Sequence, residues 1–478
     1  MDLSPPANMA HSPALDLNLQ AELQQLRSGY ETERMPSAAK RQTRLTTLEN
    51  LLLENSSAIA AAISADFSHR STHETQLLEI FPAISAIKHA KSHLRRWMKS
   101  TRSMASFWFM PARNELKPQP LGVIGIIVPW NYPLLLAVGP LVAALAAGNR
   151  AYIKMSEFTP RSGALFAKLI HAAFSDSEVR VVNGEADVAA AFSALPFDHL
   201  LFTGSTAVGK HVMRAAANNL TPVTLELGGK SPAIIGRDAD IATAAAQILF
   251  GKCLNAGQTC IAPDYVLLPR GLEAGFIDAA MAVVAKQYPA FSANKDYTSI
   301  INMRHVERLT GYLDEAVKRG ASVWPLADAE AGTQKMAPTI VTNAPEDTKL
   351  MQEEIFGPIL PLVSFDNMSE AIAFVNKRPR PLALYYFGND SGEREQVLNN
   401  TIAGGVSVNE TIMHISQEDL PFGGVGASGM GAYHGKFGFD AFSKLKPIFH
   451  QSRFNGLFLF KPPYGKRFET LVKFLMKR

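Results

Sequence analysis

The uncharged stretch from Pro118 to Asn149 constrains the fold of this chain more than any other feature of the sequence. It is long enough to cross a bilayer, since about twenty apolar residues suffice for a spanning helix. Its middle, however, contains Pro129, Asn131 and Pro133, where a spanning helix needs unbroken backbone hydrogen bonds. We therefore predict that this stretch is not a membrane span.

The stretch divides instead into a strand, a sharp loop and a helix. "GVIGIIVPW" is short and rich in β-branched residues, which is typical of a strand buried on both faces of a parallel sheet. "PLLLAVGPLVAALAAGN" is typical of a buried helix that begins at Pro133 and stops at Gly148. The loop "PWNY" then follows the carboxyl end of a strand, where open α/β sheets bind their ligands.

Strand and helix patterns alternate through most of the chain. Residues 17–103 have helical periodicity, and strand–helix units follow from residue 118 onward. A second alternating set begins near "VTLELGG" and continues through "ILPLVSF". Such alternation predicts an α/β fold with right-handed crossovers and parallel sheets in at least two domains.

Bulk properties exclude several classes of protein. A chain of 478 residues exceeds one compact core, and its 47% hydrophobic and 19% charged content is ordinary for a globular protein. A net charge of +4 without a dense basic patch gives no indication of nucleic-acid binding. Residues 1–20 lack the regions of a secretory signal, so we expect a loose tail and a cytoplasmic protein. Cys253 and Cys260 are then reduced thiols.

The C-terminal segment "SRFNGLFLFKPPYGKRFETLVKFLMKR" combines basic and aromatic residues. This character fits a helix lying on a membrane surface, and it also fits a docked tail or a subunit contact. We favour the docked tail or subunit contact.

Two side chains are candidates for chemistry. Cys260 lies in the polar, glycine-containing loop "NAGQTC", where a thiolate could be held near backbone N–H donors; a small buried hydrophobe is the alternative. Glu226 lies in the apolar strand "VTLELGG", where burial would raise its pKa toward that of a general base; a salt-bridged structural carboxylate is the alternative.

Two further segments could contact a cofactor. "FTGSTAVG" follows a strand and opens a helix, so its N–H groups could bind a phosphate, although an ordinary capped helix start has the same pattern. Lys154 and Glu157 end another predicted strand and could bracket a ribose, or could form a solvated pair.

Together these segments resemble the aldehyde dehydrogenase superfamily. The matching pieces are "VPWNYP", "IKMSE", "LLFTGSTAVG", "LELGGKSP", "NAGQTC", "EEIFGP" and "PFGGVGASGMGAYHGKFGF", in the order of the family. The last piece and "NAGQTCIAPDYVL" are similar to the class 3 branch, and within it to bacterial coniferyl-aldehyde dehydrogenases. "IKMSE" departs from many relatives in having Met155 where they carry Pro.

The resemblance implies a Rossmann-type cofactor domain over residues 1–225 and an α/β catalytic domain over 226–415. Residues 416–478 would form a C-terminal return and, with residues 105–120, an oligomerisation element. It also implies a homodimer that uses NAD, with NADP still usable, and needs no metal. The substrate would be an aromatic aldehyde such as coniferyl aldehyde. A fatty-aldehyde enzyme is the alternative within the family, and an inactive structural protein on the same fold is the alternative outside enzymes.

The resemblance assigns roles residue by residue. Cys260 matches the nucleophile, Glu226 the base that activates water, and Asn131 the side chain that stabilises the oxyanion together with the Cys260 N–H. The expected cofactor contacts are Trp130, Lys154, Glu157, Thr203, Gly204, Ser205, Thr206, Ala207, Val208, Gly209, Leu227, Glu354 and Phe356.

Overall fold

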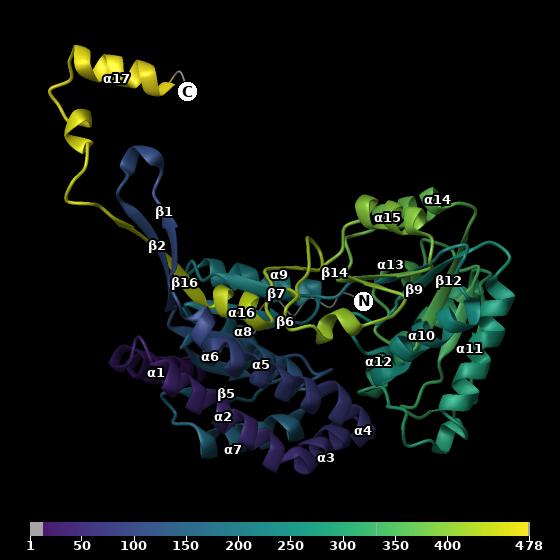
Figure 1. Cartoon of the computed structure of the whole chain (residues 1–478). Coiled ribbons are helices and arrows are strands. Elements are labelled where there is room, and N and C mark those ends of the chain that lie inside the picture. The colour runs from purple at the N-terminus through teal and green to yellow at the C-terminus, as the bar shows by residue number, and fades with distance from the viewer. Residues whose placement is uncertain (1–12, 331, 477–478) are drawn as a thin grey trace.

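The computed structural model describes residues 13–330 and 332–476 (Figure 1). The chain begins with a layer of helices: α1 (Pro13–Thr32), α2 (Ala38–Glu54), α3 (Ser56–Asp66), α4 (Thr72–Thr75), a π-helical turn η1 (Gln76–Ile80) and α5 (Phe81–Trp97). The predicted loose tail is therefore too long, because α1 already covers residues 13–20. Residues 1–12 lie outside the described part of the chain.

A six-stranded sheet forms the first lobe, in the order β15-β7-β6-β3-β4-β5. Its strands are β3 (Val123–Ile127), β4 (Arg150–Lys154), β5 (Val179–Val182), β6 (His199–Thr203), β7 (Val223–Glu226) and the antiparallel β15 (Gly429–Met430). Helices α6 (Leu135–Ala147), α7 (Pro160–Ala173), α8 (Ala186–Ser193) and α9 (Thr206–Ala217) connect the parallel strands.

The predicted strand, loop and helix in residues 118–149 are confirmed by β3 and α6. All five residues of β3 are buried. Gly148 ends α6 with φ = 94°, a left-handed conformation that glycine adopts without strain.

A seven-stranded sheet forms the second lobe, in the order β10-β11-β12-β9-β8-β13-β14. Its strands are β8 (Pro232–Ile235), β9 (Tyr265–Pro269), β10 (Ser322–Pro325), β11 (Thr339–Thr342), β12 (Ile359–Phe365), β13 (Ala383–Phe387) and β14 (Gly405–Val408). Its helices are α10 (Ile241–Cys253), α11 (Glu273–Gln287), α12 (Met303–Lys318), α13 (Lys349–Gln352), α14 (Met368–Asn376) and α15 (Ser391–Asn400). The two lobes lie side by side (Figure 1).

The strand "VTLELGG" is not the start of the second set, contrary to the sequence-based expectation. It forms β7, which pairs in parallel with β6 in the first sheet. The second sheet begins only at β8, because the glycines that follow Glu226 let the chain leave one sheet for the other.

A third, three-stranded sheet projects from the first lobe (Figure 1). It contains β1 (Thr101–Met104), β2 (Arg113–Pro120) and β16 (Ser443–His450), all antiparallel, and α16 (Gly435–Ala441) leads into β16. Beyond β16 the chain extends to the amphipathic helix α17 (Lys466–Met476), which lies away from the two lobes. Within residues 13–330 and 332–476, no helix has both the length and the apolar character that a membrane crossing requires.

Candidate active site

Four predicted site residues meet at one edge of the six-stranded sheet. The strands β7, β6, β3 and β4 are parallel neighbours, so their carboxyl ends lie together. Thr203 is the register partner of Glu226, and Lys154 is the partner of Ile127 at the end of β3. The loop containing Asn131 follows β3. This is the edge at which open α/β sheets bind ligands.

A cavity lies at this edge and is lined by both Cys260 and Glu226. Thr203 and Leu227, which the resemblance assigned to the cofactor, also line it. Most of its remaining wall is apolar or aromatic, including Leu78, Leu136, Ile412, Tyr132, Phe422 and Tyr433. The cavity therefore suits a ligand with an apolar skeleton that presents one polar group to Cys260.

Cys260 reaches the cavity from a turn with left-handed backbone. Asn255 and Ala256 have φ values of 51° and 52°, and Gly257 follows with φ = 74°. A Cβ on Gly257 would lie 2.3 Å from the carbonyl oxygen of Gly357, so only glycine fits there. The Cys260 side chain is half-buried, whereas Cys253 is buried within α10.

Cys260 is a thiol in the resting site. Burial raises its pKa to about 12, and the carboxylates of Glu354 and Glu226 act in the same direction. Hydrogen bonds from the main-chain N–H groups of Cys260 and Ile261 oppose this shift only in part. This shift favours the thiol at neutral pH, so formation of the thiolate requires a base.

Glu226 is the best-placed base. Its side chain is 2% exposed, and neither carboxylate oxygen has a hydrogen-bond partner among the described residues. Burial raises its pKa well above the ordinary value. The alternative of a salt-bridged structural carboxylate finds no support, because no ion pair to Glu226 is present in the described part of the chain.

Asn131 is held beside the Cys260 loop. Its side chain is 3% exposed, and its Nδ2 donates a hydrogen bond of 3.1 Å to the carbonyl oxygen of Gln258. A carboxamide nitrogen carries two hydrogens, so one remains for a ligand. The Asn131 side chain is thus a fixed donor, held by the carbonyl group of Gln258, which precedes the candidate nucleophile by two residues.

The turn between β6 and α9 has the features of a phosphate site. Ser205 caps α9, and its Oγ accepts from the Val208 N–H at 3.3 Å. A Cβ on Gly209 would lie 2.7 Å from the Leu227 side chain, so the helix packs closely there. The helix start is exposed at Ala207 and Val208, which leaves first-turn N–H groups accessible to an anion.

Lys154 and Glu157 form an ion pair, with Lys154 Nζ 3.4 Å from Glu157 Oε2. Lys154 is 1% exposed, and burial lowers its pKa although Glu157 raises it. The pair is therefore not the solvated surface pair that was the alternative. Lys154 ends β4 and Glu157 lies in the turn after it, and neither side chain lines the cavity that contains Cys260.

Trp130 and Phe356 come together at the rim, as ring centroids 5.3 Å apart. Glu354 lies against the glycines after β7: a Cβ on Gly228 would be 2.1 Å from Glu354 Oε2, and the Gly229 N–H bonds the carboxylate. Burial raises the pKa of Glu354 to about 8. A dinucleotide bound along the sheet edge fits this arrangement. It would contact Trp130, Glu354 and Phe356, the exposed start of α9, and the Lys154–Glu157 pair.

One member of this rim, His305, has no signal in the sequence. The ring of His305 on α12 lies beside that of Trp130, with centroids 5.2 Å apart and planes tilted by 49°, and meets the Phe158 ring edge-on at 6.4 Å. Burial lowers the pKa of His305 to about 4, helped by the charges of Arg308 and Arg304. The ring is therefore neutral, and a single histidine in a helical pattern carries no sequence mark of this role.

Known proteins match the chain over most of its length. The model of the "Aldehyde dehydrogenase family" matches residues 18–448. A probable coniferyl aldehyde dehydrogenase of Pseudomonas aeruginosa is 52% identical, over 96% of each chain. A coniferyl aldehyde dehydrogenase of Pseudomonas sp. strain HR199 is 48% identical, over 91% of this chain and 92% of the relative. The solved substrate-bound state of Staphylococcus aureus AldH superposes with a TM-score of 0.91 at 36% identity, over 96% of this chain and 99% of the other.

Cys260 and Cys253 should differ in their rates of alkylation. The pH dependence of the Cys260 rate should reflect its raised pKa. Since the thiolate is the reactive form and burial raises the pKa of Cys260 to about 12, labelling by iodoacetamide should be slow at neutral pH. The rate should then climb steadily as the pH rises to about 10. Intact-mass measurement should find one label, absent in Cys260→Ser, because Cys253 is inaccessible. Rapid labelling with a plateau at neutral pH would contradict the raised pKa.

Proposed function

The chain belongs to the aldehyde dehydrogenase family and is an NAD(P)-dependent oxidoreductase acting on aldehydes, and we propose that it oxidises an aromatic aldehyde such as coniferyl aldehyde to the acid. The observation that carries the proposal is the apolar cavity in which Cys260 and Glu226 face the same space between aromatic walls. Tyr132, Phe422 and Tyr433 suit an aromatic ring, since stacked and edge-to-face ring contacts add to the free energy of burial. The relatives named as coniferyl aldehyde dehydrogenases support the same choice.

In the proposed reaction Cys260 Sγ bonds to the aldehyde carbon while the carbonyl electron pair moves to the oxygen. The thiol proton passes to the ionised form of Glu226, which lines the same cavity; its raised pKa makes this carboxylate a stronger base than an exposed one. The oxyanion receives hydrogen bonds from Asn131 Nδ2 and the Cys260 N–H. Each such donor contributes about 3–4 kcal/mol when it is preorganised.

When bound, the oxidised dinucleotide supplies the hydride acceptor, so that the thiohemiacetal on Cys260 can become a thioester. Glu226 releases the thiol-derived proton to solvent and, as the carboxylate again, takes a proton from a water molecule, whose oxygen attacks the thioester carbon. The carbon–sulfur bond breaks, and Cys260 leaves as the thiolate with the carboxylic acid as product. We assign cofactor binding to residues 1–225 and this chemistry to residues 226–415.

The proposal predicts a substrate ranking that depends on one thiol. The kcat/KM for coniferyl aldehyde should exceed that for hexanal, because the aromatic walls contact a ring more extensively than a flexible chain. Formation of NADH, followed by its absorbance, should vanish in Cys260→Ala and persist in Cys253→Ala. A preference for hexanal would favour a fatty-aldehyde enzyme, and retention of a tenth of the activity in Cys260→Ala would remove it as the nucleophile.

We further propose that NAD is preferred over NADP. Glu157 would accept hydrogen bonds from the hydroxyls of the adenine ribose and would repel a 2′-phosphate. Its partner Lys154 would attract that phosphate, so the two charges oppose each other at 3.4 Å. A moderate preference follows in which NADP remains usable.

The wild-type ratio of kcat/KM for NAD over NADP should be about tenfold or somewhat more, equivalent to about 1.4 kcal/mol. Glu157→Gln should narrow the ratio by improving use of NADP, because the amide no longer repels the phosphate. Both cofactors are compared at saturating aldehyde. An unchanged ratio in the variant would show that Glu157 does not set the choice.

We also propose a homodimer held by what we call the basic arm: residues 101–120 together with 443–478. These segments contain twelve lysines and arginines against two glutamates, so the arm carries a net charge of +10 in a chain of +4. The rest of the chain therefore carries −6. The arm of one copy is complementary in charge to the body of another.

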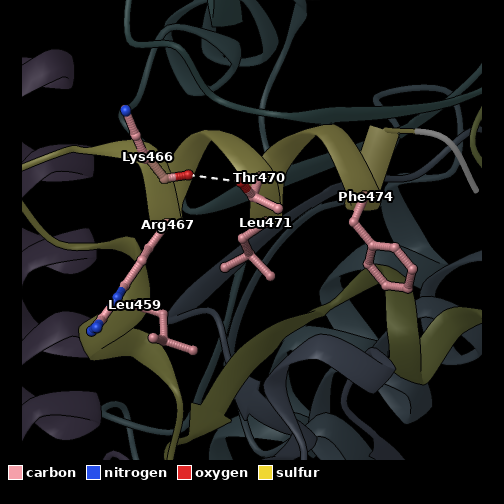
Figure 2. Close-up of a pocket in the computed structure, with 6 residues that line it drawn as sticks. All are labelled: Leu459, Lys466, Arg467, Thr470, Leu471 and Phe474. Carbon is pink, nitrogen blue, oxygen red and sulfur yellow. Dashed lines mark hydrogen bonds between the residues drawn. The ribbon is translucent and has the colours of Figure 1, made fainter.

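The arm also presents apolar surface away from the body. Phe454 is 86% exposed and Phe107 is 71% exposed. Figure 2 shows Leu471 and Phe474 on one side of α17, above Leu459, with Arg467 on the same side; together these side chains line a hollow. Exposed aromatic surface with a cationic rim is the composition expected of a subunit contact.

Removing residues 454–478 should weaken the dimer. Size-exclusion chromatography with light scattering should give twice the chain mass for the full-length protein and a concentration-dependent shift toward the monomer after truncation. A matched variant replaces only the three arm cations Lys466, Arg467 and Lys473 by Gln; it should weaken the dimer at low salt, and its difference from the wild type should shrink as the salt concentration rises. Retention of the full-length protein by lipid vesicles, lost on truncation, would instead identify α17 as a membrane-surface helix.

A further inference from the structure

Three charged side chains outside the proposed reaction are buried behind the active site. Arg70 and Glu79 are 0% exposed and Glu74 is 8% exposed. They lie within ten residues of one another, between α3 and α5, with Glu74 in α4 and Glu79 in η1. Burying charges is costly, and an ion pair in the interior offsets this cost only when its geometry is well satisfied. Their contacts therefore need an explanation.

Arg70 and Glu79 form hydrogen bonds to the main chain on both sides of the Asn131 loop. Arg70 donates from the same nitrogen to Glu79 Oε1 at 2.7 Å and to the main-chain oxygen of Asn131 at 3.2 Å. The second oxygen of Glu79 accepts from the N–H groups of Leu134 and Leu135 at 2.7 and 3.1 Å. The loop is thus bonded before and after the turn into α6.

The Arg70 guanidinium also packs on the ring of Tyr132, 4.9 Å from its centroid. Tyr132 is the residue after Asn131, and its hydroxyl is hydrogen-bonded to Thr259 Oγ1 at 2.6 Å. Thr259 precedes Cys260. The contact therefore extends from Arg70 through Tyr132 to the loop of the nucleophile.

Glu74 holds the other loop. One carboxylate oxygen accepts from the main-chain N–H of Asn255 at 3.0 Å, and the other is hydrogen-bonded to the hydroxyl of Thr298. Asn255 is the first of the left-handed residues that lead to Cys260, a conformation that costs free energy in a residue with a Cβ. Glu74 stabilises the turn at this point.

The hydrogen bonds that hold the Asn131 loop and those that hold the Cys260 loop are connected through Asn255. Its Nδ2 donates to the main-chain oxygen of Asn131 at 3.0 Å and to that of Gln258 at 3.1 Å. The Asn131 side chain donates to the same Gln258 oxygen. Asn131 and the Cys260 loop are consequently fixed relative to each other by hydrogen bonds that trace back to Arg70, Glu74 and Glu79.

We propose that Arg70, Glu74 and Glu79 are positioning residues that hold the two oxyanion donors, Asn131 Nδ2 and the Cys260 N–H, at the spacing required by the transition state. The inference rests on the oxyanion role proposed for Asn131. It predicts a catalytic effect from residues that touch neither substrate nor cofactor, because a displacement of about 1 Å in a preorganised donor can cost about 100-fold in rate.

The test is a double-mutant cycle between Glu79, one of the positioning residues, and Asn131, the donor that it is proposed to hold. Glu79→Gln keeps the volume of the side chain but removes the charge that pairs with Arg70. It should lower kcat by roughly tenfold or more while the KM for NAD changes by less than about twofold. In the Asn131→Ala background the same change should have little further effect on kcat, because the donor is already absent.

Glu49→Gln is the matched control. Glu49 is another buried glutamate of the helical layer, 8% exposed and paired with Lys91 at 2.7 Å, and within the described residues it makes no hydrogen bond or ion pair to either loop. It should leave kcat unchanged and lower the melting temperature by an amount comparable to Glu79→Gln. If Glu79 had only a structural role, Glu79→Gln and Glu49→Gln would have similar effects on kcat as well as on the melting temperature.

Each outcome decides between the proposals. Additive losses of kcat in Glu79→Gln and Asn131→Ala would overturn the positioning role while leaving the oxyanion role intact. A normal kcat in Asn131→Ala alone would overturn the oxyanion role, and the positioning proposal with it. Should Glu79→Gln fail to fold, Glu74→Gln replaces it, since that variant leaves the Arg70–Glu79 pair in place, and the same non-additivity with Asn131→Ala is expected.

Discussion

The burial of ionisable groups without full charge partners is the constraint on which this active site depends. Glu226 is enclosed with no hydrogen-bond partner among the described residues, and its pKa is raised by that burial. Burial likewise raises the pKa of Cys260 and of Glu354 and lowers that of Lys154. Each shift favours the neutral form. The resting site is therefore less charged than its composition suggests, and its reactivity depends on moving protons.

The sequence could predict those parts of the fold whose signals are local. The run that became β3 and α6 contains its own start and stop signals, and the polar loop between them lies at a strand end. Strand membership is not local, however. β7 has the same apolar pattern whether it pairs with β6 or with β8, and only its tertiary neighbours decide. The first turn of α1, residues 13–16, was missed because the helix begins at Pro13, before the periodic pattern becomes long enough to be recognised.

The residues of the site divide in the same way, into those with a local sequence signal and those that only tertiary contacts reveal. Cys260 and Glu226 lie in local settings that are unusual for a thiol and a carboxylate, so their sequence context pointed to them. His305 lies on a helix of the second lobe and meets Trp130 of the first lobe only in the folded chain. Arg70 precedes Asn131 by 61 residues, and Glu74 precedes Asn255 by 181. No periodicity reports such contacts, because their partners are a carbonyl oxygen and an N–H group that every residue carries.

In the proposed reaction, the electrostatic coupling between Cys260 and Glu226 sets the order of the proton transfers. The charge of Glu226 raises the pKa of Cys260, so a thiolate and a carboxylate are costly to hold together in this apolar cavity. Transfer of one proton from the thiol to the carboxylate avoids that cost, because the number of charges in the cavity does not change. After the acyl group is on sulfur, the thiolate is gone, and Glu226 can lose its proton without facing a neighbouring negative charge. Acylation thereby prepares the base that the water molecule needs for deacylation, and one carboxylate serves both halves of the reaction.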